Sequence, residues 1–226
     1  MSSATTTAGR LRLGARGQQG RARRLLEWGG FAAGAIMIAF GIVAIVLGFN
    51  GRSTVNDSLA QEKIVGSPDM TPSAIAKEAK QAGVTNVDLP TASVANQAID
   101  TGSEARTFSQ YMRIHALEAT GGYTYAQMGQ FQAKPGTPKS QLEPGGGTSN
   151  EKFAVTDPKT GGPAANGERT VWINETALST ALNTSYMADQ LGNFGIVVGI
   201  ALILAGAGFI ILALGGALRR PDATAV

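Results

Sequence analysis

The chain has 226 residues but no cysteine and only one histidine, His115. The absence of cysteine excludes disulfide bonds, thiolate nucleophiles, iron–sulfur clusters and cysteine-ligated zinc. One histidine is too few for the histidine sets that hold catalytic zinc. The G-x-x-x-x-G-K-[ST] phosphate loop and the G-x-S-x-G nucleophile turn are also missing. We therefore expect no enzyme, no cofactor and no metal ion, and an enzyme that uses a pair of carboxylates is the alternative that stays open.

Charged side chains are missing from two long apolar runs, residues 29–49 and 194–218. At about 1.5 Å per residue, a helix over either run is long enough for a hydrocarbon layer of about 30 Å. Without Asp, Glu, Lys, Arg or His in either run, a transporter or pump is disfavoured. We expect transmembrane helices at residues 28–49 and 193–218, and an uncleaved anchor rather than a signal peptide at the first.

The flanks of the two runs carry a clear charge bias. Residues 1–27 contain six arginines and a single acidic residue, and residues 219–226 contain two arginines and one aspartate, whereas residues 50–193 have 11 basic and 14 acidic side chains. Since cytoplasmic flanks keep positive charge, both tails are expected in the cytoplasm and residues 50–192 outside it, at the plasma membrane. The basic tail has no interleaved aromatics, so we expect no nucleic-acid partner.

Small residues recur at helical spacing within both runs. Such residues let two helix backbones approach closely in a bilayer. The pattern predicts an antiparallel helix pair, and it leaves open that one glycine face binds another membrane protein or a second copy of the chain. The expected packing residues are Gly30, Gly34, Gly41, Gly48, Gly195, Gly199 and Gly206.

Between the runs the sequence favours a mainly α fold of short helices. Thr71 and Pro72 begin an expected helix over residues 74–82, with Gly83 after its end, and a stronger helix is expected over residues 104–119. Short helices are possible over residues 90–99 and 123–128, and residues 133–167, rich in Pro and Gly, read as a flexible loop. The apolar spacing predicts that the first span extends as a helix above the membrane and that residues 169–191 run as a helix into the second.

One helix turn and two tyrosines are the strongest candidates for a site. His115 and Glu118 lie three residues apart and can share a metal ion, but two ligands are too few for a site. With Tyr111 and Tyr125 they form a hypothetical ligand or partner surface.

Three stretches of the chain, residues 62–72, 111–125 and 172–191, carry a resemblance to a known group. In these stretches the sequence resembles actinobacterial two-span membrane proteins of uncharacterised function. The resemblance implies a bacterial plasma-membrane protein and supplies no catalytic residue. Many relatives carry a cysteine pair flanking the segment that here covers residues 92–107, and this chain has neither cysteine.

These observations favour a non-catalytic envelope protein, an accessory or interaction subunit of a membrane complex. Its expected partners are the lipid bilayer and another membrane protein or a second copy. The alternative is an extracytoplasmic ligand-binding or sensing module anchored by two helices.

Overall fold

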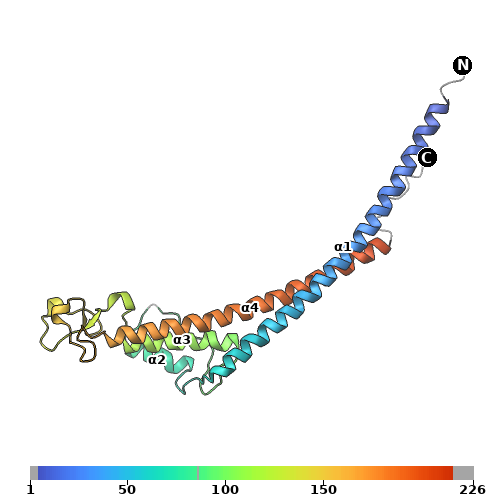
Figure 1. Ribbon diagram of the computed structural model, residues 1–226. Coiled ribbons are helices and arrows are strands. Elements are labelled where there is room, and N and C mark those ends of the chain that lie inside the picture. The colour runs from blue at the N-terminus through green and yellow to red at the C-terminus, as the bar shows by residue number, and fades with distance from the viewer. Residues whose placement is uncertain (1–4, 86, 216–226) are drawn as a thin grey trace. The chain divides into compact units, whose positions relative to one another are not determined.

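The computed structural model describes residues 5–85 and 87–215, and its side chains from residue 24 onward. Within this part the fold is mainly helical, as expected, with four α-helices: α1 (Thr5–Glu62), α2 (Pro72–Gln81), α3 (Gly102–Ala119) and α4 (Gly167–Leu214) (Figure 1). The chain divides into two compact units. The first unit is formed by the residues up to Asn50 with those from Leu191 onward, and the second unit by Gly51–Gln190. The expected second tail, residues 219–226, and the last three residues of the expected second span lie outside the described residues.

The first unit is a pair of helices formed by α1 and α4. Both helices are long and apolar enough to cross a membrane, and only 11% and 17% of their most apolar windows is buried. Three glycines of α1 each lie against the backbone of a glycine of α4. In each of the three pairs, a Cβ added to the glycine of α1 would lie 2.6 Å from the carbonyl oxygen of the glycine of α4. The opposed glycines, Gly34–Gly206, Gly41–Gly199 and Gly48–Gly192, show that the helices are antiparallel.

The seven-residue spacing of these glycines keeps the contact on one stripe of each helix. A Cβ at Gly41 would also lie 2.7 Å from the side chain of Ile203, and one at Gly199 would lie 2.6 Å from Ile45. Each glycine therefore receives an isoleucine of the other helix, and dispersion contacts over short backbone distances hold the pair together. Gly195 is less tightly packed, because a Cβ there would lie 3.5 Å from the carbonyl oxygen of Ala44. Gly30 is half-buried in α1.

The second unit is built around α2 and α3, which lie side by side along the first part of α4 (Figure 1). Its larger apolar cluster takes residues from all four helices and from the segments between them. That cluster consists of Leu59, Met70, Ile75, Ala79, Val94, Ile99, Ala105, Phe108, Tyr111, Ile114 and Leu182. A smaller cluster of Ala116, Leu117, Met128 and Trp172 continues it toward the far end of α3.

The ends of α2 and α3 are set by local chemistry. Thr71 caps α2 by accepting a hydrogen bond from the amide of Ala74, and Gly83 follows the helix with φ +68°, a conformation that favours glycine. At α3, Thr101 and Glu104 form a reciprocal capping box, which starts the helix at Gly102, two residues before the expected start. Both expected helices are confirmed to within a turn.

The prediction of a short helix over residues 90–99 is wrong, because backbone groups of this segment form hydrogen bonds with a distant segment instead of with each other. The amides of Asn96 and Ile99 donate to the carbonyls of Gly66 and Ile64, and the amide of Gly66 donates to Gln97. A Cβ at Gly66 would overlap the carbonyl oxygen of Val94, so the absence of a side chain lets the two segments meet. The segment therefore forms no helix: it pairs through isolated bridges with Val65 and Gly66, just after α1, and turns at Asn96, where φ is +56°.

The region between α3 and α4 is a series of short turns. Residues 125–127 form a 3₁₀ turn, η1 (Tyr125–Gln127), in place of the expected short helix. Within the expected loop, β2 (Gly147–Thr148) pairs antiparallel with β1 (Phe131–Gln132), and 3₁₀ turns η2 (Lys139–Gln141) and η3 (Glu151–Phe153) flank it. These elements were not anticipated for residues 133–167.

Asn166 ties this region to α4. Its side-chain amide donates to the carbonyls of Gly129, at 2.9 Å, and Gly145, at 3.1 Å, while its oxygen accepts from the amide of Glu168 at the start of α4. The residue is only 4% exposed. One buried side chain therefore holds two turns of the loop and caps the helix that follows.

Candidate functional site

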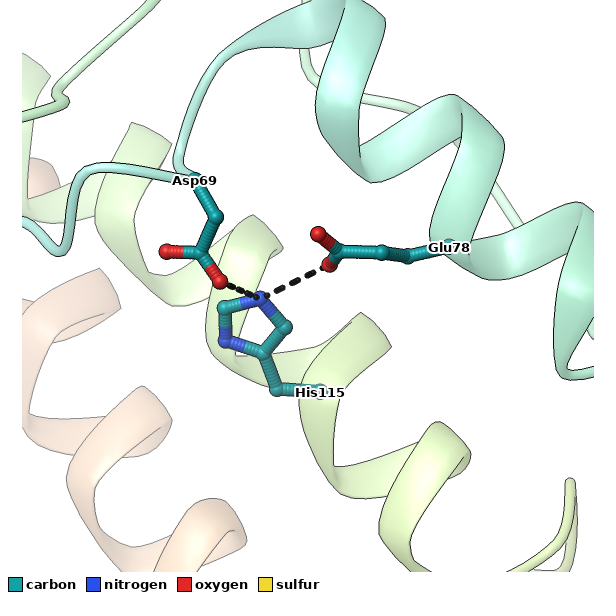
Figure 2. A group of neighbouring side chains, drawn as sticks. All are labelled: Asp69, Glu78 and His115. Atoms are coloured by element: carbon teal, nitrogen blue, oxygen red, sulfur yellow. Dashed lines mark ion pairs between the residues drawn. The ribbon is translucent and has the colours of Figure 1, made fainter.

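His115 on α3 faces two carboxylates (Figure 2). Its Nε2 atom lies 3.4 Å from Oδ2 of Asp69 and 3.4 Å from Oε2 of Glu78. The ligand atoms of the three residues lie within 4.8 Å of one another. The side chains are partly accessible, at 28% for His115, 25% for Glu78 and 44% for Asp69.

Three separate segments bring these side chains together. Glu78 is carried by α2, which buries Ile75 and Ala79 in the core, and His115 follows the buried Ile114 of α3. Asp69 lies in the turn before α2. Packing of α2 against α3 therefore places the histidine and the glutamate at the edge of the same interface.

The hydroxyl of Ser67 positions Asp69 by donating a hydrogen bond to its Oδ1. This hydrogen bond, against a smaller opposing effect of burial, holds the pKa of the Asp69 carboxyl below its ordinary value of 3.8, and a backbone hydrogen bond and His115 act in the same direction. Asp69 is therefore a carboxylate at neutral pH.

Two atoms of the group have unmet hydrogen-bonding capacity. Nε2 of His115 and Oε2 of Glu78 are both buried as atoms, and neither has a hydrogen-bond partner within the described part of the chain. Buried polar atoms are normally paired, and those that are not call for a specific explanation.

The four residues of the hypothetical ligand or partner surface do not lie together. Tyr111 is fully buried, donates its hydroxyl to the carbonyl of Ala92 at 2.9 Å, and has a pKa raised by burial. Glu118 is exposed and is not part of the cluster. Tyr125 stacks under the guanidinium of Arg169, 3.8 Å from its ring centroid. Only His115 joins a group of chemically competent side chains.

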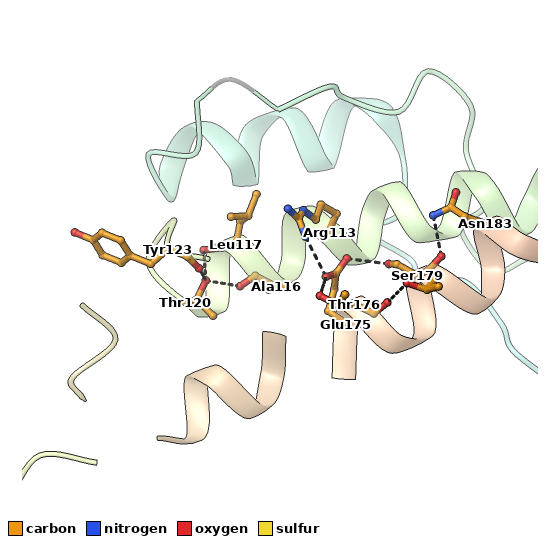
Figure 3. A network of polar contacts seen from close by, with 10 residues as sticks. Arg113, Ala116, Leu117, Thr120, Tyr123, Glu175, Thr176, Ser179 and Asn183 are labelled. Carbon is orange, nitrogen blue, oxygen red and sulfur yellow. Dashed lines mark hydrogen bonds and ion pairs between the residues drawn. The ribbon is translucent and has the colours of Figure 1, made fainter. Parts of the chain in front are cut away.

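A second polar group connects α3 with α4 (Figure 3). Glu175 on α4 is only 4% exposed and lies 3.3 Å from Nη1 of Arg113 on α3. Its carboxylate also accepts hydrogen bonds from the hydroxyls of Ser179, at 2.8 Å, and Thr176, at 3.3 Å. Arg113 in turn lies 4.0 Å over the ring of Trp172, so one cation meets both a buried anion and an aromatic face.

An open surface runs along α4 beside this group, and we name it the α4 groove surface. Its polar half is a groove of about 600 Å³ whose lining includes Asp88, Arg106, Arg113, Asn183 and Met187. Its apolar half is a groove of about 520 Å³, lined by Tyr125, Trp172, Ile173, Thr176, Ala177 and Thr180. Thr176 and Thr180 line both halves, which makes the surface continuous.

Comparison with known proteins identifies no relative. No family model, curated protein or solved structure matches the chain.

Sequence reasoning found His115 but not its partners. Asp69 and Glu78 lie far from it along the chain, and in the sequence each is one of 16 acidic residues with no local pattern to select it. Of the α4 groove surface, sequence reasoning had named Tyr125 as a candidate partner residue, but the side chains of α4 that line the groove with it form no motif.

Proposed function

We propose that the chain is a two-pass plasma-membrane protein of the bacterial envelope and that its second unit, residues 51–190, lies outside the cytoplasm. The two apolar helix windows support this proposal, because little of either window is buried and large side chains such as Phe40, at 65%, and Leu204, at 68%, are exposed. In a bilayer these side chains face lipid. The arginine-rich flanks favour cytoplasmic termini, and the resemblance to actinobacterial two-span membrane proteins agrees with this assignment.

The second unit acts as a non-catalytic interaction module for another membrane protein or a second copy. The observation that carries this function is the apolar half of the α4 groove surface. Ile173 is 51% exposed and Tyr125 is 41% exposed, although both lie outside the apolar windows where lipid would cover them. Large apolar side chains gathered around a groove are typical of a protein-binding surface.

Short side chains form the floor of this groove. Thr176, Ala177 and Thr180 lie on one face of α4, in the turns that follow the larger Ile173. A partner segment can therefore come close to the helix backbone and place an apolar side chain in the groove.

A photo-crosslinking amino acid at position 177 tests the proposal in cells, with the same probe at the exposed Lys159 as the matched control. We expect the probe at 177 to give one defined protein adduct that survives mild-detergent purification. The additional substitution Thr180→Arg, which fills the groove, should abolish that adduct while the amount of chain in the membrane stays unchanged. Adducts equally strong at 159, or insensitive to Thr180→Arg, would contradict a specific interaction there.

A second candidate function, binding of a small anionic ligand, is favoured by the polar half of the surface. Arg106 and Arg113 both line this half, seven residues apart on α3 and thus on one face of the helix. Asp88 and Glu175 line it too, and Arg113 is paired with Glu175, which leaves Arg106 as the main contact for an anion. Arginine is the side chain best suited to carboxylate and phosphate groups. Native mass spectrometry of the purified chain distinguishes the two functions, because a bound small anion without any crosslinked protein would favour the ligand.

A further inference from the structure

We propose that Asp69, Glu78 and His115 form a binding site for one divalent transition-metal ion of the Zn²⁺ type. The juxtaposition of these three side chains, each from a different segment, carries this inference. On its own helix, the sequence offered only Glu118 as a second ligand for His115. It gave no indication of Asp69 or Glu78, which lie far from His115 along the chain.

The distances in the group fit a shared ion. With bonds of about 2.0–2.2 Å to nitrogen and oxygen, two ligands of a tetrahedral zinc ion lie about 3.3–3.5 Å apart. Nε2 of His115 lies 3.4 Å from a carboxylate oxygen of Asp69 and 3.4 Å from one of Glu78 (Figure 2). The third pair, the oxygens of Asp69 and Glu78, lies within 4.8 Å, so an ion bound between the three atoms would draw the two carboxylates toward each other by side-chain rotation.

The unmet hydrogen-bonding capacity of the group points the same way. Nε2 of His115 lies at ion-pair distance from both carboxylates, yet it makes no hydrogen bond with either one. Oε2 of Glu78 is also buried and unpaired within the described residues. A metal ion would satisfy both atoms together, and its two positive charges would balance the two carboxylates.

The donor set selects the kind of ion. Ca²⁺ and Mg²⁺ prefer oxygen ligands alone, whereas an imidazole nitrogen with carboxylates suits zinc and neighbouring first-row metals. The side chain of Asp69 is 44% exposed, so an ion can enter from solvent and keep water in the remaining positions.

A bound ion would tie the turn at Asp69 and helix α2 to helix α3. This chain has no disulfide bonds to brace its second unit, and a metal cross-link between distant segments has a comparable constraining effect. We therefore assign the site a structural role, which does not depend on what the α4 groove surface binds.

Zinc titration of the full-length chain tests the site, using detergent-purified protein that has been treated with chelator and carries a histidine-free affinity tag. We expect saturable binding of one Zn²⁺ per chain and a higher melting temperature with zinc than without it. Both effects should be lost in His115→Ala and in Glu78→Gln. Glu118→Gln is the matched control, because Glu118 lies one turn away on the same helix, is exposed and belongs to no such group.

Melting curves without metal show whether each variant folds, and the titration is read only on variants with a cooperative transition. Absence of saturable zinc binding in the wild-type chain would overturn the proposal and leave the three side chains as a group of ion pairs. Zinc binding that His115→Ala and Glu78→Gln leave unchanged would overturn it too. Crosslinking at position 177 requires no metal, so the failure of one proposal is distinguishable from the failure of the other.

Discussion

Gly41 of α1 and Gly199 of α4 touch through their backbones: a Cβ on either glycine would lie 2.6 Å from the carbonyl oxygen of the other. Real Cβ atoms do not approach a carbonyl oxygen so closely, so any larger residue at either position must push the helices apart. The same reciprocal contact recurs at Gly34 and Gly206. Helix pairing in the first unit therefore depends on glycine at these positions, and not merely on apolar composition.

Replacement of Gly41 by Leu is expected to separate the helices and lower the amount of folded protein and its melting temperature. The loss of melting temperature should be several times that of a typical surface substitution, because the backbone of Gly199 as well as the side chain of Ile203 blocks the new atoms. Gly208→Leu is the matched control, since Gly208 is in the same apolar stretch of α4 and a Cβ there meets nothing within 4 Å. Equal effects of the two substitutions on the melting temperature would refute the close packing at Gly41.

Asn166 should be more sensitive to a change of charge than to truncation. Asn166→Ala removes the cap of α4 and the two donated hydrogen bonds, which we expect to cost about 1–3 kcal/mol. Asn166→Asp keeps the acceptor for the amide of Glu168 but turns a carboxylate oxygen toward the carbonyls of Gly129 and Gly145. It should therefore be the more destabilising variant at neutral pH.

Thermal unfolding of both Asn166 variants at pH 7 and pH 4 provides the measurement. Acidification protonates the new aspartate and restores a hydrogen-bond donor. It should therefore reduce the difference in melting temperature between the two variants. Hydrogen exchange should show faster exchange in residues 129–165 for both. If Asn166→Asp were as stable as the wild type at neutral pH, the side chain would not be donating as described.

Glu104 predicts an acid-dependent contribution to the stability of α3. Burial raises the pKa of this carboxyl, but hydrogen bonds from the Thr101 hydroxyl and the amides of Asp100 and Thr101 outweigh burial, so the net pKa lies below the ordinary value of 4.5. A carboxyl with a lowered folded-state pKa adds stability above its unfolded-state pKa and loses that stability as pH falls through the folded-state pKa. The ionised carboxylate of Glu104 should therefore stabilise α3 at neutral pH.

Comparison of the wild type with Glu104→Gln isolates this effect. Glutamine keeps an oxygen that accepts from the same amides but cannot titrate. The melting temperature of the wild type should exceed that of the variant at pH 7, and the difference should close as the pH drops below 4.5. A difference that stayed constant with pH would show that ionised Glu104 does not stabilise the cap.

Membrane topology can be tested cleanly because the chain has no cysteine of its own. A single cysteine in place of the exposed Lys159 should react with a membrane-impermeant maleimide added to intact cells, whereas one in place of Gly17 should react only after the membrane is permeabilised. The reverse pattern would place the second unit in the cytoplasm and overturn the proposed orientation.

Features governed by neighbours along the chain could be predicted from the sequence. The two apolar runs, the Thr71 cap and the glycine after α2 each depend on residues that are close together in the sequence. Their physical causes, which are the transfer of apolar surface and the satisfaction of helix-end amides, are local, so the pattern alone shows them. The seven-residue spacing marks which glycines can form a packing stripe, but their pairing across the two helices is a long-range contact.

Features that join distant segments required the tertiary structure. Residues 90–99 have a sequence compatible with a helix, yet hydrogen bonds to Gly66 and Ile64 hold them in a non-helical conformation. His115 was visible as the lone histidine, but only the packing of α2 on α3 brings Glu78 to it, and only the Ser67 hydrogen bond positions Asp69. The sequence by itself thus determined which segments are apolar helices. Packing between segments far apart in the chain decided which side chains share a site, because contacts between distant segments produce no periodic pattern in the sequence.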